Sequence, residues 1–260
     1  MALDSQQQRS AEQFDRQAGN YGKQHILADT RDVAALLELI PDDEKQGRAL
    51  DIATGGGHTA LALARAGYVP CIGDLAPAML ENARKMIEAE GFAVESVLFP
   101  AESIPFPDAS FRIVSCRVAP HHFSDVAGFI QESYRVLEPG GYFMVIDGSL
   151  HDDDPETAEW LHQVEKLRDP SHGRLLDRAT WVRLTEEAGF TVIRAELQPM
   201  LQPDLEWYFS AAATPEENRG QVRELIATAS PHVREAMQIQ TDEKVSWTWQ
   251  RVSLLARKAL

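Results

Sequence analysis

The sequence is short of cysteine, of basic residues and of long apolar runs, and each shortage excludes a class of protein. Its 260 residues hold two cysteines, Cys71 and Cys116; in the strand order argued below, one strand lies between theirs, a separation of roughly 10 Å that is too far for a disulfide. Lys and Arg number 25 against 40 Asp and Glu, a net charge of −15, so nucleic acid and anionic membranes are poor partners. No apolar run reaches membrane-spanning length, and residues 1–10 lack a signal peptide's apolar region. We therefore expect a reduced, cytoplasmic protein.

What the sequence does contain is a strand, a glycine turn and a helix in succession over residues 48–65. Residues 49–53 are apolar except for Asp51, as in a buried parallel strand. Three glycines at 55–57 follow, which let the backbone turn sharply and approach a ligand closely. The helix predicted over 59–65 begins with free amides that bind acceptor atoms. A small polar ligand is therefore predicted to lie over the glycines.

Two cofactors fit this unit, and the first is a dinucleotide. The run Gly55-x-Gly57-x-x-Ala60 satisfies the dinucleotide-binding fingerprint. Asp74 follows at the distance expected of an acid that binds a ribose. On this pattern alone NAD is an allowed cofactor.

The same stretch resembles motif I of the class I S-adenosylmethionine-dependent methyltransferases, D-x-G-x-G-x-G. It reads here Asp51-Ile-Ala53-Thr54-Gly55-Gly-Gly57, with Ala53 in place of the first glycine. NAD-binding units generally do not need an acid at the position of Asp51, whereas a carboxylate there can hold a cationic amino-acid ligand directly or through water. The alternative for Asp51 is a turn-stabilising role. The resemblance implies that S-adenosylmethionine is surrounded by Asp51, Ala53, Thr54, Gly55 and Gly57.

A second stretch resembles the same family where the next helix begins. The family's D-L-S-P-x-M-L stands here as Asp74-Leu75-Ala-Pro77-Ala-Met79-Leu80. The resemblance implies that Asp74 accepts both ribose hydroxyls, which suits the two oxygens of one carboxylate. It also places Leu75 and Met79 against the cofactor. The alternative for Asp74 is a helix-capping role.

A third stretch, residues 100–111, resembles the family's G-D-A-E-x-L-P-F-P-D-x-S-F-D with two departures. Pro100 replaces a residue that often bonds the adenine amino group, and proline offers neither a side-chain acceptor nor an amide donor. Arg112 replaces the final Asp. Adenine is then held by backbone groups of Ala101 and Glu102, by a Glu102 contact, or by apolar packing.

The loop after the predicted strand 111–116 carries Arg117, His121 and His122. Ligands bind outside the carboxyl ends of strands in such sheets, so we expect the chemistry here and count Arg117 among the cofactor-binding residues. One histidine is predicted to act as a base or to orient the substrate; a core or surface histidine pair is the alternative. Neighbouring histidines rarely bind one ion together, so no metal is expected.

The N-terminal region is predicted to be a helical lid. Phe14, Ala18 and Tyr21 share a helix face and resemble the F-x-x-x-A-x-x-Y opening of many of these enzymes. Tyr21 is therefore predicted to lie near the transferred methyl group and to take part in catalysis. A purely hydrophobic anchor is the alternative. We expect residues 1–30 to order as a lid when cofactor binds.

The resemblance covers residues 14–197 and is strongest over 48–147. It is closest to the ubiquinone/menaquinone-biosynthesis C-methyltransferase-like branch, methyltransferase type 11. It implies an α/β, Rossmann-like sheet of seven mostly parallel strands in the order 3-2-1-4-5-7-6, with strand 7 antiparallel and helices on both faces. The predicted strands are 49–53, 68–73, 92–99, 111–116, 142–147, 190–197 and 245–258.

The organisation follows from this fold. We expect one domain over 1–260: a lid at 1–45, a cofactor-binding half at 46–147, and a substrate-side half at 148–260 with an insertion at 198–243. The implied reaction is direct displacement of the methyl group of S-adenosylmethionine by an O, N or C nucleophile of a small molecule, which yields S-adenosylhomocysteine. The protein is expected to be a monomer or homodimer without membrane insertion. A cofactor-binding protein without methyl transfer and an NAD-dependent oxidoreductase remain alternatives.

Overall fold

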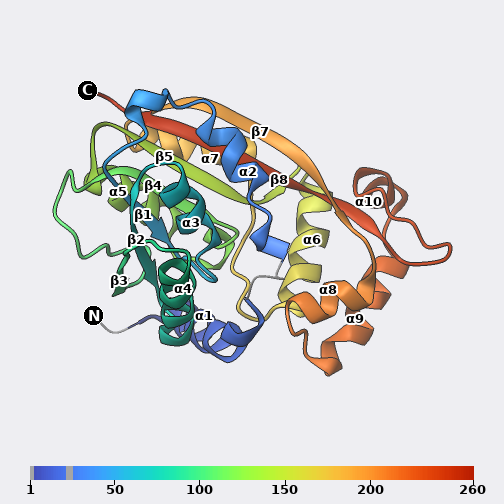
Figure 1. The fold of residues 1–260 in the computed structure, drawn as a ribbon. Coiled ribbons are helices and arrows are strands. Elements are labelled where there is room, and N and C mark those ends of the chain that lie inside the picture. The colour runs from blue at the N-terminus through green and yellow to red at the C-terminus, as the bar shows by residue number, and fades with distance from the viewer. Residues whose placement is uncertain (1–2, 22–25) are drawn as a thin grey trace.

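A mixed sheet with helices on both faces forms the body of the molecule in the computed structural model, which describes residues 3–21 and 26–260 (Figure 1). The sheet has the order β3-β2-β1-β4-β5-β8-β7, with β8 antiparallel to both neighbours and the other pairs parallel. This confirms the predicted order, because β7 and β8 are the sixth and seventh predicted strands. The strands are β1 Arg48–Ile52, β2 Val69–Asp74, β3 Glu95–Leu98, β4 Phe111–Arg117, β5 Leu137–Leu150, β6 Leu176–Asp177, β7 Phe190–Gln202 and β8 Trp247–Lys258.

The strands differ from the prediction mainly in length. The short β6, which pairs with β5, was not predicted. The strand β7 runs on to Gln202, five residues into the predicted insertion, because it pairs with β8 along its whole length. The strand β3 is shorter than the predicted 92–99. At the sheet edge it has one neighbour, β2, and only the residues paired with that neighbour are held extended.

Several of the helices begin at a side chain that caps them. Asp125 accepts a hydrogen bond from the Gly128 amide at 2.9 Å to start one helix, and Asp177 accepts from the Thr180 amide at 2.6 Å to start another. The helices are α1 Ser5–Gln17, α2 Arg31–Leu37, α3 His58–Arg65, α4 Pro77–Ala89, α5 Val126–Val136, α6 Pro155–Arg168, α7 Arg178–Glu187, α8 Leu205–Ala211, α9 Glu216–Ala227 and α10 Pro231–Ala236. Clusters of buried side chains join α2, α3 and α4 to one face of the sheet and α5 and α7 to the other.

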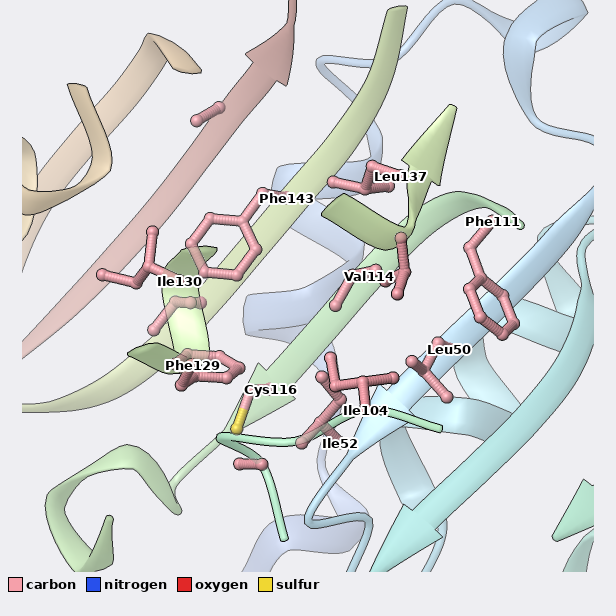
Figure 2. Packing of buried hydrophobic residues seen from close by; sticks show 14 of the residues in the cluster. Leu50, Ile52, Ile104, Phe111, Val114, Cys116, Phe129, Ile130, Leu137 and Phe143 are labelled. Atoms are coloured by element: carbon pink, nitrogen blue, oxygen red, sulfur yellow. The ribbon is translucent and has the colours of Figure 1, made fainter. Parts of the chain in front are cut away.

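A large cluster of buried apolar side chains forms where β1, β4 and β5 lie side by side. Figure 2 shows Leu50, Val114 and Phe143 from these strands in one cluster with Phe129 of α5, and all four are fully buried. Each such side chain contributes roughly 1.5–3 kcal/mol when it leaves water. Core packing therefore fixes the strands whose carboxyl ends carry the site.

Both cysteines lie within this sheet and are free and buried. Cys71 on β2 pairs with one side of β1 and Cys116 on β4 with the other. One strand therefore separates them, as predicted.

A separate helical cap stands beside the carboxyl ends of the central strands. It consists of α6, α8, α9 and α10, which pack around buried Tyr208, Phe209 and Trp247 and lie together in Figure 1. Most of the predicted insertion belongs to it, as α8 to α10. The cap supplies one wall of the candidate site.

The helix α1 lies across the other side of the site, against α4. Four of its glutamine side chains donate hydrogen bonds from Nε2 to the body. Gln6 donates to the Ser171 carbonyl at 2.5 Å, and Gln13 and Gln17 donate to the Ala212 carbonyl at 3.1 and 3.3 Å. Gln7 donates to the Glu102 carboxylate at 3.0 Å. These amides hold the helix over the strand ends.

Candidate active site

Three adjoining cavities lie at the carboxyl ends of β1, β2 and β4. The first lies under α1 and is called here the α1 cavity. The second lies along the glycine turn and is the loop cavity. The third faces the helical cap and is the cap cavity. Phe14 lines all three, and Tyr21 lines the loop and cap cavities, so these two side chains stand at the junction.

The glycine turn is held from behind by Asp51. This carboxylate accepts hydrogen bonds from the Thr54 hydroxyl at 2.7 Å and the Ser115 hydroxyl at 2.6 Å. It is buried, and it is absent from the residues that line the three cavities. Burial raises the pKa of Asp51 to about 6, although both hydroxyls and Arg117 favour its charged form. The contacts therefore show the turn-stabilising role, and a direct ligand contact stays a prediction.

The residues around Asp51 have two kinds of surroundings: some line a cavity, and one packs against a helix. Ala53, Thr54 and Gly55 line the loop cavity. Ala53 has a φ of +51° and thus takes the left-handed conformation that the family's glycine would favour. A Cβ on Gly57 would meet Ala83 of α4 at 3.0 Å, at a φ of +79°. The last glycine is therefore required for packing against α4 rather than for space in the cavity.

Asp74 stands where the α1 and loop cavities meet. Its two oxygens accept hydrogen bonds from the Gly55 amide at 3.0 Å and the Ala76 amide at 2.9 Å. It lines both cavities, and burial raises its pKa. Leu75 lines the α1 cavity and Met79 the loop cavity. Each carboxylate oxygen keeps further acceptor capacity, so a diol can bind without breaking the bonds to the turn.

Ala101 and Glu102 lie on the wall of the α1 cavity. The Glu102 carboxylate accepts hydrogen bonds from Gln7 Nε2 and from the amide and hydroxyl of Ser124, each at 3.0 Å. It therefore ties α1 to the start of α5. Its side chain is engaged in this way, which leaves backbone contact and apolar packing as the simpler means of holding a ligand.

Arg117 ends β4 and lines the loop cavity. Its guanidinium donates to the Leu27 carbonyl at 2.8 Å and to the Asp32 carboxylate at 3.0 Å. Arg251 of β8 pairs with the same carboxylate at 3.0 Å. Two cations thus share the Asp32 carboxylate, and Arg117 also lies close enough to Asp51 to favour the charged form of that carboxyl. Asp32 and Arg251 escaped prediction because no motif marks them.

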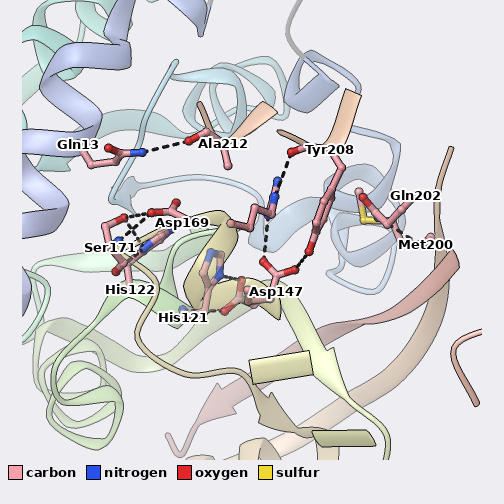
Figure 3. A network of polar contacts seen from close by, with 12 residues as sticks. Gln13, His121, His122, Asp147, Asp169, Ser171, Met200, Gln202, Tyr208 and Ala212 are labelled. Atoms are coloured by element: carbon pink, nitrogen blue, oxygen red, sulfur yellow. Dashed lines mark hydrogen bonds and ion pairs between the residues drawn. The ribbon is translucent and has the colours of Figure 1, made fainter. Parts of the chain in front are cut away.

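The two adjacent histidines have different surroundings (Figure 3). His121 Nδ1 lies 2.6 Å from Asp147 Oδ1, and its amide donates to Asp147 Oδ2 at 2.9 Å. His122 Nδ1 lies 3.0 Å from the Ser171 carbonyl and therefore donates to it. Both rings line the cap cavity. Because Nδ1 carries the proton in each ring, Nε2 is the atom left to accept one.

Electrostatics separates the histidines further. Burial lowers the pKa of His121, but the charge and hydrogen bond of Asp147, together with the charges of Glu165 and Asp169, outweigh burial and raise the pKa above its usual value. Burial and the proximity of His121 lower the pKa of His122 to about 3. His121 can therefore take up a proton near neutral pH, whereas His122 stays neutral. Sequence reasoning could not choose between them, because Asp147 is 26 residues from His121 in the chain.

Comparison with known proteins identifies the family. Residues 50–145 match the family described as methyltransferase domain. The solved structure of a Bacillus halodurans protein assigned to the methyltransferases is 32% identical, has a TM-score of 0.83, and covers 88% of this chain and 100% of its own. The chain belongs to the methyltransferase family.

Curated relatives of this methyltransferase agree with that assignment. The uncharacterized methyltransferase YcgJ of Bacillus subtilis is 33% identical over 171 residues, which is 65% of this chain and 66% of that protein. The demethylmenaquinone methyltransferase of Chlorobaculum tepidum is 39% identical over 111 residues, 41% of this chain and 43% of that protein. The matches thus span two thirds or less of these relatives' length.

The residues of this methyltransferase fit S-adenosylmethionine. The loop cavity reaches the backbone of the glycine turn, because Thr54, Gly55 and Gly56 line it. Asp74 stands at its junction with the α1 cavity, where a ribose would join the two ends of the cofactor. The α1 cavity is lined mostly by apolar side chains and suits a flat base.

Two further observations concern only the part of the chain that is described. Within residues 3–21 and 26–260, no group of three His, Cys, Asp or Glu side chains could hold a metal ion. Across the same ranges, no helix has the length and apolar character needed to cross a membrane.

Tyr21 and the cap cavity supply an aromatic surrounding for an acceptor. Phe14, Tyr21, Trp207 and Trp249 line this cavity, together with the charged side chains of Arg168, Asp169 and Arg251. Burial, and next Asp169, raise the pKa of Tyr21 to about 12, so its phenol stays protonated. Its predicted place near the methyl group agrees with its position at the junction and stays a prediction.

Proposed function

We propose that this methyltransferase moves the methyl group of S-adenosylmethionine to a small-molecule acceptor that loses a proton to His121. The observation that carries the proposal is the His121–Asp147 pair on the wall of a cavity that meets the cofactor-type cavities at Phe14 and Tyr21. When bound, S-adenosylmethionine supplies an electrophilic methyl group, and its product is S-adenosylhomocysteine.

The chain divides the binding of this cofactor among its cavities. Asp74 accepts hydrogen bonds from the ribose, with Leu75 beside it. The loop cavity holds the amino-acid end through Thr54, Gly55 and Arg117, and Met79 packs against it. The α1 cavity holds the base against Ala101 and Glu102. Asp51 and Ala53 keep the turn in shape, and the charge of Asp51 favours a cationic amino group nearby.

His121 and its neighbours prepare the acceptor. An acceptor in the cap cavity gives its proton to His121 Nε2, and Asp147 stabilises the imidazolium that forms. Phe14 and Tyr21 exclude water from the junction, and alignment of donor and acceptor supplies most of the rate. Because His121 must be neutral to act, activity rises with pH through its pKa, which lies above 6.5.

The proposal is tested by binding and by turnover. Calorimetry should show binding of S-adenosylhomocysteine and none of NAD. Small hydroxylated and amino compounds are then screened with methyl-labelled cofactor. His121→Ala should lower kcat by about 10²–10⁴-fold for an acceptor that must be deprotonated, and the matched His122→Ala should change it far less. Cofactor binding without transfer to any small molecule would contradict a methyltransferase role for this site.

A further inference from the structure

Ser10 is a helical serine whose buried hydroxyl has no partner among the described residues. Two other helical serines satisfy the hydroxyl by donating to the carbonyl four residues earlier: Ser133 to Phe129 and Ser210 to Glu206, each at 2.8 Å. Ser10 makes no such bond. An unpaired buried hydroxyl costs about 1–3 kcal/mol. Because Ser10 lines the α1 cavity, a ligand bound there can supply the missing partner.

The cavity that Ser10 lines is otherwise short of polar groups that could bind a base. Its wall includes Ala11, Phe14 and Phe99, which suit the faces of a flat ring. The edge of such a ring needs a hydrogen-bond partner. The Glu102 carboxylate already accepts hydrogen bonds from Gln7 and Ser124.

Most other side chains that could meet the edge of the flat ring are already engaged or have no polar atom. Gln7 is occupied at both ends of its amide, since Nε2 donates to Glu102 and Oε1 accepts from the Asp4 amide at 3.0 Å. Pro100 has no polar side-chain atom. His122 also lines this cavity, but its ring packs edge-on against Phe14 with centroids 4.8 Å apart. The Ser10 hydroxyl is thus a buried side-chain group without a partner that the ring edge can use.

We infer that the Ser10 hydroxyl binds the edge of the cofactor's adenine, so that α1 recognises the base. Adenine offers ring nitrogens that accept and an amino group that donates, and a hydroxyl can meet either. The inference rests on the proposed function, because it assumes that S-adenosylmethionine occupies these cavities. It explains how the chain holds adenine where Pro100 stands.

The test compares ligands with and without the base. Ser10→Ala should weaken S-adenosylhomocysteine and 5′-methylthioadenosine by the same factor, about fivefold to tenfold. S-ribosylhomocysteine, which lacks adenine, should keep its affinity. All three are measured by calorimetry, or by competition where binding is weak. Alanine is a better helix former than serine, so α1 is preserved in the variant.

The matched control loosens α1 without touching its cavity. Gln13→Ala removes the bond to the Ala212 carbonyl and should affect the three ligands alike. Equal losses for all three ligands with Ser10→Ala would show a packing role and overturn the inference. So would a change of less than about twofold for S-adenosylhomocysteine. Failure of the wild-type protein to bind S-adenosylhomocysteine would instead overturn the proposed function, and the inference with it.

Discussion

Asp51→Asn should make the protein more stable at neutral pH while it weakens cofactor binding. Burial raises the pKa of Asp51 from 3.8 to about 6 in the folded protein. The contribution of Asp51 to the free energy of unfolding is therefore fully present below pH 3.8, and it is lost as the pH rises through about 6. The difference between the two pKa values corresponds to roughly 3 kcal/mol. The asparagine of the variant does not titrate, and the Thr54 and Ser115 hydroxyls can each donate or accept, so its amide can stay hydrogen-bonded.

The assay is urea unfolding followed by tryptophan fluorescence at a series of pH values. The stability of the variant minus that of the wild type should rise by up to roughly 3 kcal/mol between about pH 4 and about pH 7. Groups common to both proteins cancel in this difference. Calorimetry at neutral pH should show weaker binding of S-adenosylhomocysteine to the variant, because its amino group loses an anionic neighbour. A difference in stability that stays flat or falls with pH would refute the reasoning about the buried charge.

Three further changes test other parts of the site. Asp74→Ala should weaken S-adenosylhomocysteine binding by about 1.5–3 kcal/mol, the scale of hydrogen bonds to a charged group; an unchanged dissociation constant would remove the ribose role. Gly55→Val should abolish binding in a folded protein, whereas Gly57→Val should chiefly lower stability, because its side chain meets Ala83; thermal unfolding and calorimetry separate the two. Hydrogen exchange over residues 10–20 should slow when S-adenosylhomocysteine binds, and equal protection in both states would make α1 a fixed scaffold. The expected effect for residues 22–25, which belong to the same predicted segment, lies outside the described residues.

The fold could be predicted because its signals are local. Apolar runs of strand length, glycine turns and capping aspartates recur along the chain, and the family resemblance ordered the strands. The short β6 escaped because two residues carry no pattern. The extension of β7 escaped because pairing with a strand some 50 residues later decides it, as when Gln202 pairs with Trp247.

The candidate site could be predicted only as far as its motifs reach. The motif residues around Gly55 and Asp74 do gather at one end of the sheet. No motif marks the partners that set their chemistry. Asp147 raises the pKa of His121, and Arg251 pairs with Asp32, the carboxylate to which Arg117 donates. These contacts arise from tertiary packing, so single-sequence reasoning left His121 and His122 equal.

The glutamine contacts of α1 have a consequence for how this protein tolerates change. Three of the four glutamines donate to main-chain carbonyls, at Ser171 and Ala212. A carbonyl is present whatever side chain its residue carries, so either position can be substituted without loss of the acceptor. The fourth contact depends on the carboxylate of Glu102. The hydrogen bonds that attach α1 are therefore specified mostly by side chains of the helix itself. The residues beneath the helix can change with the methyl acceptor while the helix stays in place.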